Sequence, residues 1–516
     1  MKNCFKIYIF SITTLLYGQI WIDAAPEILY YDNNLGQGNN NYNIMRPFIN
    51  NNDYNFFLGF QNENYFNNNA PNQENMSNKY FQKGTGAYFS YKIALNKEYF
   101  FLSAEPYFMN IANTSVSEPS YPSYYTDQSQ AIRSSERPGT FKWLNDRQLD
   151  SQSEVKSSGI REFQFYIKYK GILTGIANVN RWWGPGIHTS LAMSNNAPGF
   201  PHYFFGLNDI NFLSKKIKLN FNYMVGEVGR HERPYFFTGI IGTLTHKSIE
   251  NDITLGFTRT YVSGGINLEG ERQWTLRDAA SLPAEGLLLT SKKDLWYTEG
   301  KGTDRWDQIM TFIVHGNFKP SNLQIFFEIG FNDHLHNLYE LRAHWDVSAA
   351  YLYGIRKKGL FGYKNIIFGV EYLDLIQRTF SDHRGTTATW FDEEIYKSNT
   401  YSGRRWSAHS GADSDDFYFF LGYQGKNWTI LPAFNYERHG VVYHFPPEVK
   451  IELRLSVIYR YKNWIFDLYY ENEYFENIGF VNSNDNVWLN NPIPSSIRKT
   501  NTLIFKLQKN LYFKIN

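Results

Sequence analysis

Apolar and polar residues alternate over many short stretches of the chain. In the segment 451 to 461, apolar side chains occupy every second position, and polar residues such as Glu452 and Arg454 lie between them. A period of two is typical of a β-strand with one apolar and one polar face. The segments 163 to 169 and 216 to 225 repeat the pattern. Alternation alone fits both a water-soluble β-sandwich and a membrane barrel whose apolar faces contact lipid.

The pattern predicts about eighteen strands, an even number of the kind found in outer-membrane barrels. If the apolar rows face lipid, the side chains of Lys216, Lys218, Arg454 and Arg460 face the interior. The predicted strands are 53 to 61, 86 to 95, 97 to 110, 160 to 170, 171 to 180, 201 to 212, 216 to 228, 237 to 247, 252 to 262, 305 to 316, 321 to 332, 345 to 356, 362 to 374, 414 to 424, 426 to 437, 448 to 461, 463 to 475 and 499 to 515.

The lengths of the predicted connections also alternate. Short turns near Asn96 and Lys170 are each followed by a long excursion, 111 to 159 and 181 to 200, and this order continues to the C-terminus. Outer-membrane barrels have short periplasmic turns and long extracellular loops, whereas a sandwich has no reason to sort its loops in this way. The sequence therefore predicts an all-β fold, a transmembrane antiparallel up-and-down β-barrel with both ends periplasmic and every long loop extracellular.

The first residues have the composition of a secretory signal peptide. Lys2 and Lys6 mark a basic start, residues 7 to 16 are mostly apolar, and Gly18 is a suitable small residue before a cleavage site. The one cysteine, Cys4, lies in this segment, so we expect no disulfide or thiol chemistry in the mature chain. An exported protein is therefore predicted.

The rest of the chain is predicted to have two parts. Residues 19 to 84 form an Asn-rich periplasmic segment with a first strand near 53 to 61, and residues 85 to 516 form the barrel. The stretch 33 to 78 has too little apolar material to fold alone. This favours a mobile periplasmic segment, with a structured plug as the alternative.

Composition narrows the class of protein further. Mean hydropathy is −0.47, and after the signal peptide no stretch reaches the roughly 18 apolar residues that a membrane helix needs. Aromatic residues make up 18% of the chain, which fits the aromatic girdles of a barrel. A net charge of +2 gives no reason to expect a nucleic-acid partner. The expected partners are outer-membrane lipid and the barrel-insertion machinery, which would read the final strand.

Two aromatic and amide-rich motifs carry a resemblance to a known family. Residues 181 to 186 read Arg-Trp-Trp-Gly-Pro-Gly, and residues 194 to 202 read Ser-Asn-Asn-Ala-Pro-Gly-Phe-Pro-His. A second patch, 330 to 334, reads Gly-Phe-Asn-Asp-His. Together they resemble the capsule assembly Wzi family over residues 85 to 440.

The resemblance implies an eighteen-stranded outer-membrane barrel that helps to hold or organise capsular polysaccharide at the cell surface. Its better-known members are closed at the periplasmic end by an N-terminal helical bundle. No capped amphipathic helix precedes the barrel here, so the sequence does not predict that bundle.

The chemistry of the motifs fits sugar recognition. Indole rings stack on the C–H faces of sugars, amides bond to hydroxyls, and Arg181 could pair with an acidic sugar. In the alternative, the two tryptophans anchor at the outer interface or pack against the lumen wall, and the glycines and proline only shape the turn. The candidate glycan contacts are Arg181, Trp182, Trp183, Asn195, Asn196, His202, Asn332, Asp333 and His334, with Gly184, Pro185 and Gly186 shaping the loop.

Signs of metal or catalytic chemistry are weak. The loop 333 to 344 contains an Asp-His-x-His sequence, but hydrogen bonding within a loop explains its residues more simply than a metal does. Asp415 and Asp416, like the acidic run 392 to 394, could supply a carboxylate pair for glycoside cleavage, but a solvated or cation-binding loop is favoured. We therefore predict no enzyme, no cofactor and no metal.

The resulting functional hypothesis is a barrel that binds or organises capsular or other surface polysaccharide. A diffusion channel for small solutes is the main alternative, because inward-facing Lys and Arg residues would give a partly basic lumen. A surface enzyme acting on glycans is the third hypothesis.

Overall fold

The computed structural model describes residues 44–46, 55–71, 74–79, 81–114, 116, 154–230, 233–265, 272–286, 306–332, 342, 349–376, 400–402, 404–441, 447–478 and 497–514. The predicted signal peptide, residues 1–18, lies outside the described residues, as do Asp333 and His334.

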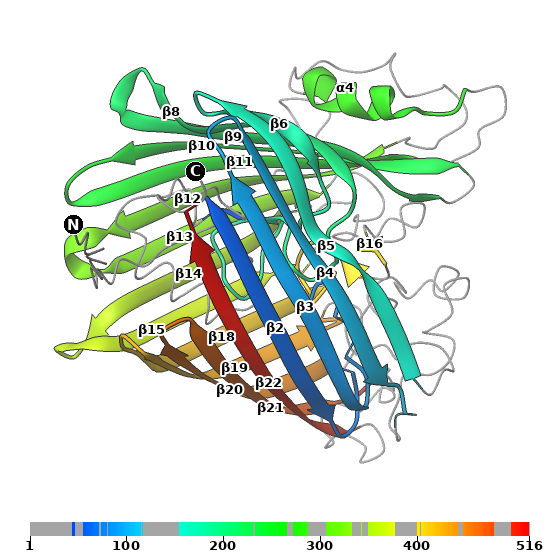
Figure 1. Cartoon of the computed structure of the whole chain (residues 1–516), viewed down its shortest axis with the longest axis vertical. Coiled ribbons are helices and arrows are strands. Elements are labelled where there is room, and N and C mark those ends of the chain that lie inside the picture. The colour runs from blue at the N-terminus through cyan, green and yellow to red at the C-terminus, as the bar shows by residue number, and fades with distance from the viewer. Residues whose placement is uncertain are drawn as a thin grey trace, which may run out of the picture.

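A closed antiparallel barrel forms the body of the molecule (Figure 1). Each strand is hydrogen-bonded to its neighbours in sequence order, and pairing between the first and last strands closes the wall. The eighteen barrel strands are β2 (Phe56–Asn67), β3 (Gly84–Asn96), β4 (Phe100–Ala112), β5 (Glu154–Tyr169), β6 (Ile172–Ala177), β8 (His202–Phe212), β9 (Ser214–Arg230), β10 (Pro234–Lys247), β11 (Asn251–Gly264), β12 (Trp306–Phe318), β13 (Leu323–Asn332), β14 (Ala349–Leu360), β15 (Tyr363–Asp374), β18 (Ser414–Gln424), β19 (Trp428–His439), β20 (Glu448–Tyr461), β21 (Trp464–Glu476) and β22 (Arg498–Phe513).

The predicted fold class is confirmed, but the predicted start of the barrel at residue 85 is wrong. Strand β2 pairs with β22 along one edge and with β3 along the other, and Figure 1 shows it between them. The alternation of this strand resembles that of the other wall strands, and closure leaves no edge with unpaired backbone groups. The barrel therefore begins at Phe56, inside the Asn-rich segment.

The outside of the wall is apolar and the inside is polar. On β20, the side chain of Leu453 is 56% exposed, whereas those of Glu452 and Ser456 are buried. The same holds on β22, where Phe505 is exposed and Lys506 is buried. The predicted lipid-facing rows thus lie on the outer surface, and water-soluble sandwich packing is excluded.

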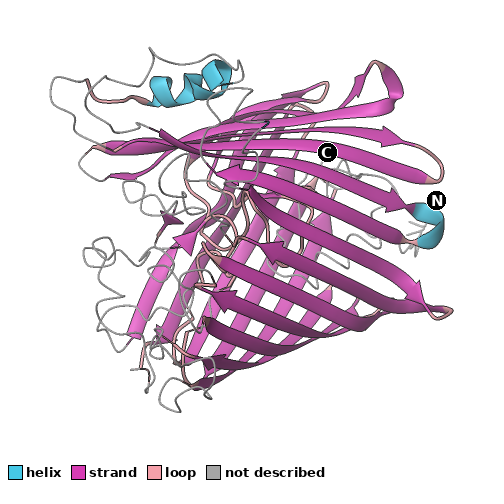
Figure 2. Cartoon of the chain, turned by 180° about the vertical axis from the view of Figure 1, so that it is seen from behind, coloured by secondary structure: helices cyan, strands magenta, loops and turns pink. Residues whose placement is uncertain are grey.

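Short and long connections lie at opposite ends of the barrel, as predicted from their alternation. The turn between β5 and β6 is residues 170–171 and the turn between β20 and β21 is residues 462–463, whereas 178–201 separates β6 from β8. Figure 2 shows the tight hairpins gathered at one end and the longer connections at the other. This polarity brings the long loops together, where they can fold over or into the lumen.

Helix α4 (Leu276–Gly286) packs on the outer side of the barrel near the long-loop end (Figure 1). Thr238 of β10 donates a hydrogen bond to the carbonyl oxygen of Ala279 at 2.9 Å, and Leu282 is buried against this wall. Thr275 donates both its backbone N–H and its hydroxyl to the carboxylate of Asp278 at 2.8 Å, which is one half of a capping box. Among the described helices, none is long and apolar enough to span a membrane.

Apart from the wall strand β2, residues 44–46 and 74–79 of the Asn-rich segment lie inside the barrel. Strand β1 (Met45–Arg46) pairs with β7 (Trp182–Trp183) of the long loop, and Ile44 belongs to the same buried apolar cluster as Trp183. Glu74 forms ion pairs with side chains of the barrel wall. The structured-plug alternative therefore describes these residues, and the prediction of a periplasmic segment is wrong for them.

Candidate functional site

Several segments fill the lumen, and we call them the plug: residues 44–46, 74–79, 178–201 and 404–413. They are far apart in sequence but bonded to one another. Ser194 donates its backbone N–H to the carbonyl oxygen of Trp406 at 2.6 Å, and Arg404 donates to the carbonyl oxygens of Ser77 and Lys79. Asn75 donates its amide to the carbonyl oxygen of His188 at 2.8 Å. The plug is therefore one bonded unit.

The Trp-Trp-Gly-Pro-Gly motif turns the long loop back into the lumen. Gly184 has a φ of +152°, and a Cβ there would lie 2.4 Å from the hydroxyl oxygen of Ser190. A Cβ on Gly186 would lie 2.2 Å from the carbonyl oxygen of Thr189. Both positions therefore require glycine, which supports the predicted loop-shaping role.

The barrel wall fixes the turn that follows. Glu371 of β15 accepts hydrogen bonds from the backbone N–H groups of Ile187 and His188 at 2.7 and 3.0 Å. On the other side, Arg46 donates to the carbonyl oxygen of Gly186 at 2.6 Å. These bonds satisfy backbone groups that would otherwise be buried without partners, which would be unfavourable by about 1–3 kcal/mol each.

The two tryptophans predicted to contact glycan have different surroundings in the structure. Trp183 is only 1% exposed and belongs to an apolar cluster with Phe237 of β10 and Trp406. Opposite its ring the wall residue is Gly239, and a Cβ there would lie 2.8 Å from the indole. Trp183 thus packs against the lumen wall, which is the alternative that the sequence left open. Trp182 instead lines a cavity.

The two asparagines predicted to contact glycan also have different surroundings. Asn196 is buried, donates to the carbonyl oxygen of Arg405 at 3.0 Å and accepts from the backbone of Asn75. Its side chain therefore joins plug segments. Asn195 is half-buried and lines the same cavity as Trp182.

Arg181, His202 and Asn332 do not line this cavity. Arg181 donates to Nε2 of His202 at 3.0 Å, and its guanidinium lies over the ring of Phe204. Burial lowers the pKa of Arg181 to about 10, which leaves it charged at neutral pH. Asn332 is buried at the end of β13. The expected contact between Arg181 and an acidic sugar therefore has no geometric support.

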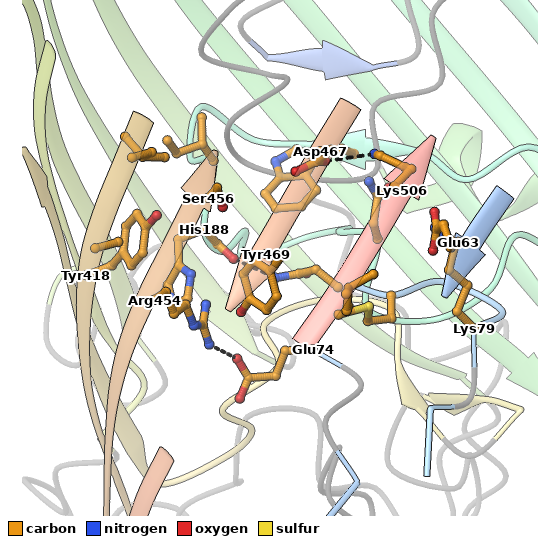
Figure 3. A pocket seen from close by; sticks show the side chains of 18 residues that line it. Glu63, Glu74, Lys79, His188, Tyr418, Arg454, Ser456, Asp467, Tyr469 and Lys506 are labelled. Atoms are coloured by element: carbon orange, nitrogen blue, oxygen red, sulfur yellow. Dashed lines mark hydrogen bonds and ion pairs between the residues drawn. The ribbon is translucent and has the colours of Figure 1, made fainter. Parts of the chain in front are cut away.

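The cavity lies between the plug and the wall formed by β18 to β22 and β2. Its volume is about 130 Å³, room for roughly four water molecules at about 30 Å³ each, or for about one sugar ring. Figure 3 shows His188 and Glu74 of the plug facing Tyr418, Arg454 and Tyr469 of the wall. The lining thus combines aromatic, amide and charged groups.

Every Lys and Arg that lines the cavity already has a carboxylate neighbour. Arg454 bonds to Glu74 at 2.5 Å and to Glu471 at 2.9 Å, Lys79 to Glu63 at 2.7 Å, and Lys506 approaches Asp467 at 3.3 Å. Dashed lines in Figure 3 mark the Arg454–Glu74 and Lys506–Asp467 pairs. Arg454 confirms the prediction of an inward-facing charged row. The lining of the cavity therefore presents both hydrogen-bond donors and hydrogen-bond acceptors.

Asp415 and Asp416 were expected in a solvated or cation-binding loop, but they lie at the start of strand β18. Asp415 accepts from Arg438 at 2.8 Å, and both Asp415 and Asp416 are buried. Asp416 faces the lumen, where it lies 3.1 Å from Nε2 of His188 and 3.3 Å from Nε2 of His409. The candidate catalytic pair is thus divided between two different networks.

Sequence reasoning missed most of the residues that organise the lumen. Glu74 lies in a segment without regular structure, Arg46 and Arg404 lie in two-residue strands too short to show a period, and His188 is a lone histidine in the long loop. The one signal that could have found wall partners such as Glu371 is the polar row of each strand, where a charged residue must face the lumen.

Comparison with protein families identifies the chain. The model of the family "Capsule assembly protein Wzi" matches residues 176–485, more than half of the sequence, and this span includes the long loop, strands β18 to β21 of the cavity wall and Asp416. The chain belongs to this family. The resemblance found in the sequence is therefore confirmed, as is the prediction of no enzyme, because the family is not one of enzymes.

Solved structures share the fold at low sequence identity. Wzi of Escherichia coli, an outer membrane protein described as involved in group 1 capsule assembly and as a carbohydrate-binding β-barrel, matches with a TM-score of 0.54 and 12% identity, over 88% of this chain and 85% of that one. OccAB4 of Acinetobacter baumannii matches with a TM-score of 0.41 and 11% identity, over 89% and 98%. OprD of Pseudomonas aeruginosa matches with a TM-score of 0.39 and 8% identity, over 89% and 96%. No curated protein sequence matches the chain.

Proposed function

We propose that this protein is an outer-membrane barrel that binds and organises capsular or other surface polysaccharide, and that the lumenal cavity holds part of the glycan. Family membership supports the role in capsule assembly, and the Escherichia coli barrel of the same fold is described as binding carbohydrate. The apolar outer surface suits lipid, and the end with the long loops would face the cell exterior.

The observation that carries the proposal is Trp182 at the cavity. Its indole N–H is buried, and no residue in the described part of the chain accepts a hydrogen bond from it. A buried donor of this kind is unfavourable unless a ligand or water pairs with it. A sugar hydroxyl can accept this bond while the ring faces of neighbouring aromatics contact C–H groups. Asn195, on the same lining, can bond to a further hydroxyl.

The charge balance of the cavity indicates the kind of sugar surface that fits. Paired Arg, Lys and carboxylate groups supply donors and acceptors for hydroxyls without a net positive field. An anionic sugar would have to compete with Glu74 for Arg454. We therefore expect contacts to hydroxyl-rich faces, whatever the charge elsewhere on the polymer.

The filled lumen favours this function over diffusion. The plug lies across the interior, and residues 181–194 are all buried within it. An open porin keeps a water-filled channel. The basic lumen expected for a channel is also absent among the cavity residues, because each described cation there lies beside a carboxylate.

Equilibrium binding of capsular polysaccharide to the protein in lipid vesicles tests the proposal. We expect Trp182→Ala to weaken binding about thirtyfold, because a ring contact and a hydrogen bond each contribute about 1 kcal/mol and about 1.4 kcal/mol is tenfold. Trp182→Phe keeps an aromatic ring but removes the N–H, so its affinity for the polysaccharide should lie between those of the unsubstituted protein and Trp182→Ala.

The matched control is Trp428→Ala, a tryptophan that is 45% exposed at the short-turn end of β19. It should leave binding unchanged. Equal binding by the unsubstituted protein and Trp182→Ala, with both barrels folded by gel mobility before and after boiling, would reject the cavity as the glycan site.

A further inference from the structure

Three buried side chains converge on one point between the plug and the wall. His188 comes from the loop 178–201, His409 from the segment before β18, and Asp416 from β18 itself. Nε2 of His188 lies 3.1 Å from Oδ2 of Asp416, and Nε2 of His409 lies 3.3 Å from the same oxygen. All three side chains are 3% exposed or less. They come from separate parts of the chain, so this convergence is a product of the fold.

The contacts among these three groups are ion-pair contacts and not hydrogen bonds of good geometry. Neither Nε2 atom, nor Oδ2 of Asp416, takes part in a hydrogen bond of acceptable geometry among the described residues. The rings are nevertheless held in place, because His188 stacks on Tyr418 with ring centroids 4.2 Å apart and meets His409 edge-on at 4.7 Å. Two imidazole nitrogens and a carboxylate oxygen are thus fixed in a dry site and directed at one another.

We propose that His188, His409 and Asp416 bind a divalent transition metal ion of the zinc type. Their ligand atoms lie within 4.8 Å of one another. With zinc–ligand bonds of about 2.0–2.1 Å, the edge of a tetrahedral site is about 3.3 Å, close to both nitrogen–oxygen distances. Imidazole with carboxylate suits zinc and its first-row neighbours better than magnesium or calcium, which prefer oxygen ligands alone.

A fourth ligand is at hand. Oε2 of Glu74 lies 3.7 Å from Nε2 of His409, and the adjoining cavity can supply a water molecule instead. A site with three protein ligands and one exchangeable position is a common zinc arrangement.

The surrounding charges favour a cation. Ion pairs that extend from this cluster connect six carboxylates with three cationic partners, Lys450, Arg454 and His439. Histidine must be neutral to bind metal, so the network keeps an excess of negative charge that a divalent ion reduces. The carboxylates are Glu74, Asp416, Glu437, Glu448, Glu452 and Glu471.

The ion would connect both long plug loops to the wall. Because each ligand stands on a different segment, metal binding would stabilise the plugged state of the barrel over any state in which a loop leaves the lumen. This stabilisation needs no bound glycan, although His188 and Glu74 also line the cavity.

Cobalt titration of the full-length protein tests the proposal. Protein without a histidine tag is purified in detergent, treated with a chelator, and titrated with Co²⁺ and then Zn²⁺ while visible absorption is recorded. We expect one equivalent of Co²⁺ to bind with the absorption of a four-coordinate site, and Zn²⁺ to displace it. His188→Ala and His409→Ala should each weaken binding at least about tenfold, since even outer-shell changes cost that much.

The control is His315→Ala, which removes a buried histidine of β12 that stacks on Phe326 away from the cluster. It should bind Co²⁺ as the unsubstituted protein does. Absence of saturable Co²⁺ and Zn²⁺ binding to the unsubstituted, folded barrel would overturn the proposal, whatever the variants do. So would binding that persists unchanged in both histidine variants.

Discussion

Replacing Trp183 by Ala tests whether the long loop is built into the barrel interior. The side chain is 1% exposed and packs with Phe237 and Trp406 under the wall at Gly239. Truncating a buried Trp to Ala in a packed core costs about 3–5 kcal/mol, from lost apolar transfer and from the cavity left behind. We expect the free energy of unfolding to fall by that amount.

The assay is urea unfolding of the protein in lipid vesicles, with folded and unfolded forms separated by gel mobility without boiling. Trp428→Ala serves as the comparison, because that ring is 45% exposed on the outer face and contacts Tyr459. Trp428→Ala should lower the free energy of unfolding by less than half as much as Trp183→Ala does. Equal losses for the two variants would refute the packing of Trp183 in the lumen.

Two further predictions concern the wall and helix α4. Gly239→Ala should destabilise the barrel by about 1–3 kcal/mol because its Cβ would meet the ring of Trp183 at 2.8 Å, whereas Gly242→Ala on the same strand, with no atom nearer than 3.9 Å, should be neutral in the same urea titration. The bonded ion pair with Arg272 holds the pKa of Asp278 well below its usual range, so this contribution to α4 is fully present above about pH 4 and falls as the solution becomes more acidic. Hydrogen-exchange protection of α4 should therefore decrease from pH 6 to pH 3, and Asp278→Asn should lower it more at pH 6 than at pH 3. A variant protected as well as the unsubstituted helix at pH 6 would contradict this.

The barrel could be predicted from the sequence because its signals are local. Each wall strand must expose apolar side chains to lipid and polar ones to the lumen, so a period of two appears wherever the wall runs. The predicted start of the barrel at residue 85 was wrong because composition was weighed against this local signal. Strand β2 keeps the period of two, but the surrounding asparagines give its segment the composition of an unfolded chain.

The interior of the barrel could not be predicted in the same way. The motif at residues 181 to 186 predicted a loop with a distinct role. Whether Trp183 contacts sugar or the wall depends on Gly239, which is more than fifty residues away and belongs to no motif in the sequence. The cluster of His188, His409 and Asp416 depends on two loops entering the lumen together. Contacts between irregular segments leave no periodicity to read.

The plugged lumen is tested most directly by conductance in a planar lipid bilayer. Single barrels of the unsubstituted protein should pass almost no steady current, because the plug segments bond across the interior and to Glu371 of the wall. Large, steady conductance steps of the kind that open porins give would contradict the account.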